Sequence, residues 1–218
     1  MTLGEAGNGP EAVDGASPDG RPGQRVGKHD AEMADRVEYV EPRLRLATHE
    51  DRDEIDALMK ASTAALFPAF YDESQTASSI VHIAHVDPML IDDATYFVLE
   101  AGGDIVACGG WSRRDKLFSG SAEQEGRARL LDPATEPARV RAMFVRGDWT
   151  RRGLGTRILA ACESAAREAG FTELALMATL PGFRLYVRYG FLEVERTSIT
   201  LPDGVELGGV AMQKVIDR

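Results

Sequence analysis

The spacing of hydrophobic and polar positions changes several times along the chain, and each spacing predicts a different element. Residues 44–47 alternate as a strand does. Thr48 then indicates a helix start, because its hydroxyl can accept a hydrogen bond from one of the first free helix amides. The apolar face of that helix is expected at Ile55, Leu58 and Met59. A second helix is predicted from Glu73 to about His85.

A hairpin is predicted next. Residues 95–100 and 105–111 are apolar and rich in β-branched and aromatic side chains, and the tight turn Gly102-Gly103-Asp104 separates them. Residues 115–137 are polar and contain Gly, Pro and Asp, which is typical of a long loop.

The second half of the chain alternates strands and helices. A strand at 139–145 leads through a glycine loop into a helix that runs to about Ala169, and Gly170 predicts its cap. The core-facing stripe of that helix is expected at Leu154, Ile158, Cys162, Ala165 and Ala169. After it we expect a strand at 174–178, a short helix opened by Pro181 and ending near Gly190, and strands near 191–200 and 205–215. The resulting order, β-α-α-β-β-β-α-β-α-β-β, predicts an α/β fold with a sheet of mixed strand direction.

Residues 1–42 differ from the rest in composition. Gly, Pro, Asp and Glu dominate, and nine acidic against four basic residues give this stretch half of the formal net charge of -10. Such a composition buries too little apolar surface to offset the entropy of ordering. We therefore expect a disordered acidic tail over 1–42 and one domain over 43–218.

Overall composition excludes several classes of protein. A sequence pI of about 4.9 argues against general nucleic-acid binding, which needs a basic surface. No apolar run reaches the roughly 18 residues of a membrane span, and no secretory signal is visible, so we expect a cytoplasmic protein. Cys108 and Cys162 have no recognisable spacing and are predicted to be buried apolar side chains. His82 and His85 are too few for a metal site, so none is expected.

The most informative segment is the glycine loop Arg151-Arg152-Gly153-Leu154-Gly155-Thr156, which joins the strand at 139–145 to the following helix. The first amides of a helix lack intrahelical partners, and the helix dipole adds partial positive charge there. Six arginines and one acid, Asp148, lie between Arg139 and Arg157 in an otherwise acidic protein. A solvated basic face would explain the arginines alone. Their coincidence with the loop favours binding of a phosphate or diphosphate.

This loop is neither of two common nucleotide motifs. A P-loop requires Lys and then Ser or Thr after its last glycine, whereas Thr156 and Arg157 follow Gly155. A dinucleotide fingerprint requires three spaced glycines and a later acid. An unrelated phosphate binder remains an alternative, because glycine loops at helix starts recur in many folds.

Thr150-Arg151-Arg152-Gly153-Leu154-Gly155 resembles the Q/R-x-x-G-x-G/A motif of the GNAT superfamily of acyl-CoA N-acyltransferases, with Thr150 in place of Gln or Arg. A second segment, Leu185-Tyr186-Val187-Arg188-Tyr189-Gly190-Phe191, is similar to the family's A-x-x-F/L-Y-x-x-x-G-F block. Gly182 occupies its alanine position, and Thr179 stands where an upstream Asn is common. The resemblance spans about residues 43–215, and its specific motifs lie between residues 139 and 191.

The resemblance implies a mixed-sheet GNAT-like acyl-CoA N-acyltransferase fold and transfer of an acetyl group from acetyl-CoA to an amine by direct attack. The acceptor would be a small-molecule or protein amine. No nucleic-acid partner, membrane partner or bound metal is expected. The diphosphate is expected on Arg151, Arg152, Gly153, Leu154, Gly155 and Thr156, and the pantetheine arm along Met143, Phe144 and Val145. The resemblance leaves the oligomeric state open and is compatible with a homodimer paired through the closing strands.

Tyr186 lies where the family often places the proton donor for the leaving thiolate, although a tyrosine in a helix can also serve only for packing. The general base is not assigned, because residues 140–145 contain no carboxylate and Glu100, Asp115 and Glu173 are only candidates. Phe67, Phe70 and Tyr71 are expected in the core or at the acceptor site. A non-catalytic acyl-CoA-binding or sensing module of the same fold is the alternative function.

Overall fold

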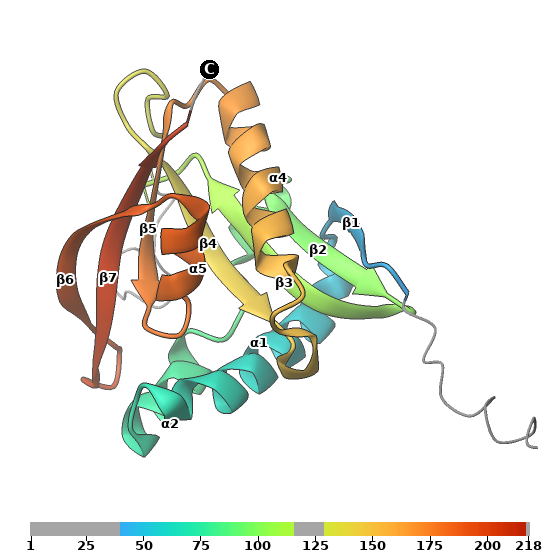
Figure 1. Cartoon of the computed structure of the whole chain (residues 1–218), viewed down its shortest axis with the longest axis vertical. Helices are drawn as coiled ribbons and strands as arrows, with labels where there is room; N and C mark the ends of the chain where they lie inside the picture. The colour runs from blue at the N-terminus through green and yellow to red at the C-terminus, as the bar shows by residue number, and fades with distance from the viewer. Residues whose placement is uncertain (1–39, 116–128, 217–218) are drawn as a thin grey trace, which may run out of the picture. The chain divides into compact units, whose positions relative to one another are not determined.

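The computed structural model describes residues 40–115 and 129–216, and in these residues seven strands form one sheet in the order β1-β2-β3-β4-β5-β7-β6. The strands are β1 (Arg43–Leu46), β2 (Tyr96–Ala101), β3 (Asp104–Ser112), β4 (Ala138–Val145), β5 (Glu173–Thr179), β6 (Leu192–Thr200) and β7 (Glu206–Val215). Neighbouring strands are antiparallel except β4 and β5, which run parallel (Figure 1). The predicted mixed sheet is confirmed. The tail predicted over 1–42 lies almost wholly outside the described residues.

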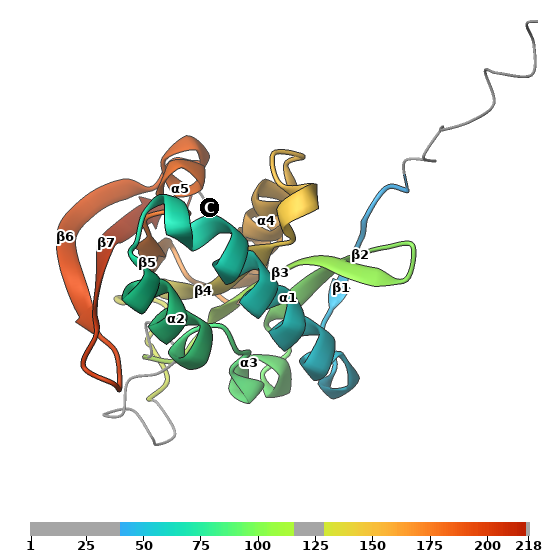
Figure 2. The same ribbon diagram turned by 90° about the horizontal axis from the view of Figure 1, so that it is seen from below.

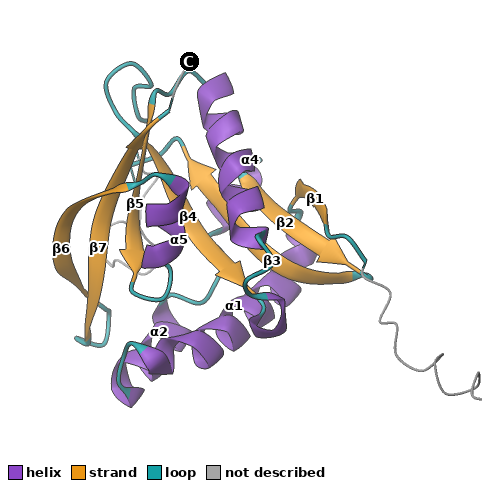
Figure 3. Ribbon diagram, viewed as in Figure 1, coloured by secondary structure: helices purple, strands orange, loops and turns teal. Residues whose placement is uncertain are grey.

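Helices cover both faces of this sheet (Figures 2 and 3). They are α1 (Arg52–Leu66), α2 (Glu73–His82), α3 (Pro88–Asp92), α4 (Leu154–Glu168) and α5 (Phe183–Tyr189). One hydrophobic core joins α4 and α5 to the sheet through residues such as Leu159 and Tyr186, and a second joins α1 and α3 to the other face through Met59 and Leu90. The site expected at the start of α4 is therefore built on a helix whose inner face is fully packed.

The observed element order matches the expected one, with local differences. The second helix ends at His82, not near His85, and the short helix α3 was not expected. Asp87 starts α3 by accepting from the amide of Met89, and Pro88 occupies its first position. The short helix expected to open at Pro181 begins at Phe183, because the chain first makes a turn from Thr179 to Gly182.

The start of α1 and the buried face of α4 differ in detail from the sequence predictions. Thr48 does cap, but it caps a 3-10 turn, His49–Asp51, that continues into α1. Asp51 accepts from the backbone nitrogen of Thr48 and from Arg45, and Arg45 holds the pKa of that carboxyl down to about 2. In α4 the predicted stripe is right at its first three positions, but the buried face ends at Ala166, and Ala169 is exposed.

Tyr71 fixes the bend between α1 and α2 to the far end of the sheet. Its hydroxyl donates to the carbonyl of Gly208 at 2.7 Å and accepts from the amide of Leu180 at 2.8 Å. Its ring packs against Phe67, with centroids 5.1 Å apart, while Phe70 is 52% exposed. Two members of the predicted aromatic cluster therefore belong to the core, and the third lies at the surface.

Both cysteines are fully buried, as predicted, Cys108 on β3 and Cys162 on α4. Burial raises the pKa of Cys108 to about 12 and also raises the pKa of Cys162. Among the described residues, no helix is both long and apolar enough to cross a membrane.

We expect Tyr71→Phe to lower the free energy of unfolding by about 1–3 kcal/mol, because it leaves the Leu180 amide and the Gly208 carbonyl without their partner. Urea denaturation followed by circular dichroism measures this. The exposed neighbour Phe70 provides the control, and Phe70→Leu should change stability by less than about 0.5 kcal/mol. A Tyr71→Phe protein as stable as the parent would show that the bend is held by packing alone.

Candidate functional site

Strands β4 and β5 start side by side and then separate. They pair only at Ala138 with Leu174 and at Arg139 with Ala175. From Val140 to Val145, β4 is paired along its β3 edge, and its other edge has no strand partner among the described residues. Backbone N–H and C=O groups are obligatory hydrogen-bonding groups, so this free edge can bind an extended ligand. We call the gap between the separating strands the fork.

A β-bulge shapes β4 beside the fork. Gly110 pairs with Arg141 and Cys108 pairs with Phe144, so Ala142 and Met143 lie opposite Gly109 alone. Ala142 has a φ of 52°, a conformation that a non-glycine residue rarely adopts. A Cβ at Gly109 would overlap the sulfur of Met143 and lie 3.0 Å from Ile158, so the Met143 side chain would have to move.

Buried polar groups hold the bulge. The fully buried Tyr96 donates its hydroxyl proton to the carbonyl of Ala142 at 2.8 Å. Arg141 is also buried and forms an ion pair with Asp87 at 3.1 Å, while burial lowers the pKa of its guanidinium. The sequence reasoning missed this part of the site. The pair Gly109-Gly110 inside a strand is the signal that could have revealed a close backbone approach.

The residues predicted to line the pantetheine arm lie along the free edge of β4. Met143 and Val145 pack toward α4, and Phe144 packs toward α1, so their side chains are divided between the two faces. Each is only partly buried. They belong to the part of β4 that is not paired with β5, and their role in binding the pantetheine arm stays a prediction.

The glycine loop ends in an unusual backbone conformation at the start of α4. Arg151 has a φ of 66° and Gly153, the residue before α4, a φ of 80°. Such alternation of left-handed residues turns successive amides toward one side, which suits an anion. Within the described residues, the backbone nitrogens of 151–156 donate no hydrogen bond, and the first helical bond of α4 comes from Arg157 to Gly153.

The two glycines of the motif have different physical roles. A Cβ at Gly153 would meet nothing within 4 Å, so this position needs glycine for its φ. Gly155 is buried, and a Cβ there would lie 2.8 Å from the side chain of Leu185. Gly155 therefore lets α5 approach α4, and Gly153 shapes the open loop.

The six arginines of the basic segment divide into two groups. Four have partners: Arg139 with Asp115, Arg141 with Asp87, Arg146 with Asp104 and Asp148, and Arg157 with the carbonyl of Pro42. In the described part of the chain, Arg151 has no ion pair or hydrogen bond, and Arg152 only lies over the ring of Trp149, 4.6 Å from its centroid. The two arginines without a counterion are those of the predicted diphosphate loop, and both are exposed.

Tyr186 lies on α5, the helix that packs between α4 and β5. Its side chain is buried, it stacks edge-on against Phe191 at 5.8 Å, and its hydroxyl bonds to no described group. Burial, with a smaller contribution from Cys162, raises the pKa of the phenol, so the hydroxyl keeps its proton at neutral pH. A protonated phenol can donate one hydrogen bond.

The structure assigns no general base. Glu100 lies on β2 and accepts from Arg45 at 2.8 Å, Asp115 pairs with Arg139 and Arg129, and Glu173 is exposed at the start of β5. None of these three carboxylates lies on β4. Within residues 40–115 and 129–216, no three His, Cys, Asp or Glu side chains are grouped so that they could hold a metal ion.

Comparison with known proteins agrees with this geometry. The model of the acetyltransferase (GNAT) family matches residues 55–191, and no curated protein matches the chain. The chain therefore belongs to the GNAT acetyltransferase family, and the expected GNAT-like fold and family membership are confirmed.

Several solved structures share the fold. A GCN5-related N-acetyltransferase from Rhodopseudomonas palustris aligns over 81% of this chain and 96% of its own, with a TM-score of 0.62 and 19% identity. The PaiA N-acetyltransferase from Thermoplasma acidophilum, in complex with coenzyme A, aligns over 80% and 99%, with a TM-score of 0.56 and 13% identity. A putative acetyltransferase from Salmonella typhimurium with its cofactor acetyl-CoA aligns over 81% of this chain and 95% of its own, with a TM-score of 0.54 and 16% identity.

We expect Gly153→Ala to destabilise the protein by about 1–2 kcal/mol, because alanine is strained at a φ of 80° although the space around it is open. Chemical denaturation measures the loss. Gly208→Ala is the matched control: a Cβ there also meets nothing within 4 Å, and its φ is not left-handed. Equal stability of the two variants would contradict a special backbone conformation at the loop.

Proposed function

We propose that the protein is an acetyl-CoA-dependent N-acetyltransferase that transfers the acetyl group to an amine by direct attack. The observation that carries this proposal is the juxtaposition of two unsatisfied backbone surfaces. One is the free edge of β4 along the fork, and the other is the set of free amides at the start of α4. Coenzyme A has matching parts, an extended arm with amide groups and a diphosphate.

The loop would bind the diphosphate. The amides of Gly153–Thr156 supply donors, and the side chains of Arg151 and Arg152 supply charge without forming an ion pair to a described carboxylate. The pantetheine arm would then lie along Met143–Val145 and exchange hydrogen bonds with the edge of β4. This places the thioester in the fork, close to the bulge at Ala142.

In the reaction, a neutral amine nitrogen would attack the thioester carbon, and the carbon–sulfur bond would break after a tetrahedral intermediate. A strand amide beside the bulge would stabilise the oxyanion. Tyr186 would donate a hydrogen bond to the leaving thiolate, and the proton lost by the amine nitrogen would reach that thiolate through the Tyr186 hydroxyl or through water, so that the products are the amide and free coenzyme A thiol. Because β4 carries no carboxylate, desolvation of the amine in the fork would favour the neutral form in place of a dedicated base.

The absence of an acid on β4 also supports the alternative, a module of the same fold that binds acyl-CoA as a sensor. The two functions differ in one measurable property, release of free thiol from acetyl-CoA when amines are added. Tight binding without thiol release across a broad panel of small-molecule and peptide amines would favour the sensor.

Coenzyme A should raise the melting temperature of the protein, by an amount that grows with the logarithm of its concentration above the dissociation constant. Arg151→Met and Arg152→Met should each weaken coenzyme A binding by roughly tenfold or more, because each removes a charge-assisted contact to phosphate. Titration calorimetry measures the dissociation constants. Arg146→Met is the control, since its guanidinium already bonds to Asp104 and Asp148, and it should alter binding less. An unchanged melting temperature in the presence of coenzyme A would contradict the proposed function, because cofactor binding is its first step.

Tyr186→Phe should reduce turnover by about 10²–10⁴-fold and leave the dissociation constant of coenzyme A nearly unchanged. Turnover should fall because the leaving thiolate would lose its hydrogen-bond donor. The fold should change little, because the Tyr186 hydroxyl has no described hydrogen-bond partner. Thiol release gives turnover, and calorimetry gives affinity. Parent-like turnover in this variant would leave Tyr186 with a packing role only.

A further inference from the structure

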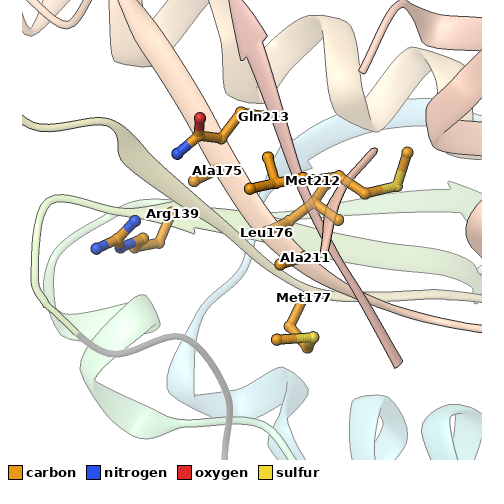
Figure 4. Close-up of a pocket in the computed structure, with 8 residues that line it drawn as sticks. Arg139, Ala175, Leu176, Met177, Ala211, Met212 and Gln213 are labelled. Atoms are coloured by element: carbon orange, nitrogen blue, oxygen red, sulfur yellow. The ribbon is translucent and has the colours of Figure 1, made fainter. Parts of the chain in front are cut away.

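A small pocket lies on the face of the sheet opposite α4. Alternate residues of these strands, such as Val140, Leu174 and Met212, belong to the core under α4 and α5. Successive strand residues point to opposite faces, so Arg139 and Ala175 project from the other side. There they line a cavity of about 120 Å³ together with Met177, Val194, Ala211 and Gln213 (Figure 4). The lining also includes Leu176 and Met212, which belong to the core under α4 and α5.

The strand register explains the shape of this pocket. Arg139 on β4 pairs with Ala175 on β5, and Ala175 pairs with Gln213 on β7, so the three residues form one row across three strands. The next row on β5 and β7 is Met177 with Ala211. The two alanines leave space between longer side chains. Figure 4 shows Ala175 between the polar ends of Arg139 and Gln213, with Met177 farther along the strand.

Arg139 has unused hydrogen-bonding capacity in this pocket. Only 16% of its side chain is exposed, and within the described residues its guanidinium makes one hydrogen bond, from Nη2 to Asp115 at 3.2 Å. Its Nε is buried without any partner. Asp115 is itself 45% exposed and shared with Arg129. Buried polar groups are normally satisfied, so an arginine held in this way indicates a missing acceptor.

A carboxylate would supply an acceptor for the guanidinium of Arg139. The planar guanidinium fork binds two carboxylate oxygens at once, and the Gln213 amide lies across the row as a further donor. Whole-ligand pockets have volumes of about 300–1,000 Å³, so a cavity of about 120 Å³ holds one end of a ligand. The apolar floor of Ala175, Ala211 and Met177 suits a short carbon chain beside the charged end.

Arg139 stands both in this pocket and at the closed end of the fork. Arg139 is the last β4 residue paired with β5, and the strands separate immediately after it. Because the bulge adds a residue without adding a full strand step, Met143 lies about 10 Å farther along β4 at a rise of roughly 3.3 Å per step. An acceptor anchored at Arg139 therefore needs several bonds between its carboxylate and the nitrogen that attacks the thioester.

We propose that Arg139 and Gln213 form an acceptor subsite that selects amines carrying a carboxylate several bonds from the amino group. This inference rests on the proposed acetyl transfer and adds the substrate class. The acetyl donor would bind from the α4 side of the sheet, and the carboxylate end of the acceptor would bind from the other side.

The test compares matched acceptors, 4-aminobutyrate with butylamine and 6-aminohexanoate with hexylamine, using thiol release from acetyl-CoA. In at least one pair, the carboxylate member should show a kcat/KM at least tenfold higher, mainly through a lower KM. Arg139→Met should remove this preference and leave the alkylamines unaffected, and Arg139→Lys should restore part of it. Arg52→Met, a change at an exposed arginine at the start of α1, should have no effect.

Equal kcat/KM within both pairs would overturn the subsite, and so would an Arg139→Met variant that slows all four amines alike. Calorimetry with the coenzyme A-saturated protein gives a readout that does not need turnover. Binding of 6-aminohexanoate that Arg139→Met abolishes would support the subsite even if acetyl transfer failed. Lack of binding would reject the subsite, whereas thiol release from other amines would leave the proposed transfer intact.

Discussion

The separation of β4 from β5 is the constraint on which the rest of the site depends. A parallel pair that continued to Val145 would satisfy the backbone groups of both strands and close the sheet. Pairing instead stops at Arg139 and Ala175. The unpaired edge favours a ligand that can complete the ladder, and the open amides of the glycine loop and the pocket at Arg139 lie on opposite faces beside it. In the proposed function, ligand binding would depend on backbone groups that the protein itself leaves unpaired.

Keeping a strand bent beside an opening requires support from elsewhere. Here it comes from groups that are costly to bury: the Tyr96 hydroxyl on the carbonyl of Ala142, and the ion pair of Arg141 with Asp87. Asp87 also starts α3, so this short helix is tied directly to β4. A buried ion pair is weak evidence for stability, but its geometric demands fit a role in fixing the position of the bulge.

Much of this structure could be predicted from local patterns. Alternation and glycine turns located the hairpin of β2 and β3, and the two sequence motifs located α4, α5 and the loop between β4 and α4. The bulge, the helix α3 and the row of Arg139, Ala175 and Gln213 could not be predicted in the same way. They depend on strand register and on contacts between residues far apart in sequence, which periodicity does not encode. Neither the sequence nor the structure assigns a general base, and the reason is the same in both: β4 contains no carboxylate.

The burial of both cysteines has a practical consequence. Cys108 and Cys162 have no exposed surface, and burial raises the pKa of both, so neither carries an accessible thiolate in the folded protein. A disulfide reagent added to the native protein will therefore not react with its cysteines. The same reagent can therefore measure local or global unfolding. It can label Cys162 only when the core beneath α4 opens, and Cys108 only when the buried face of β3 becomes exposed.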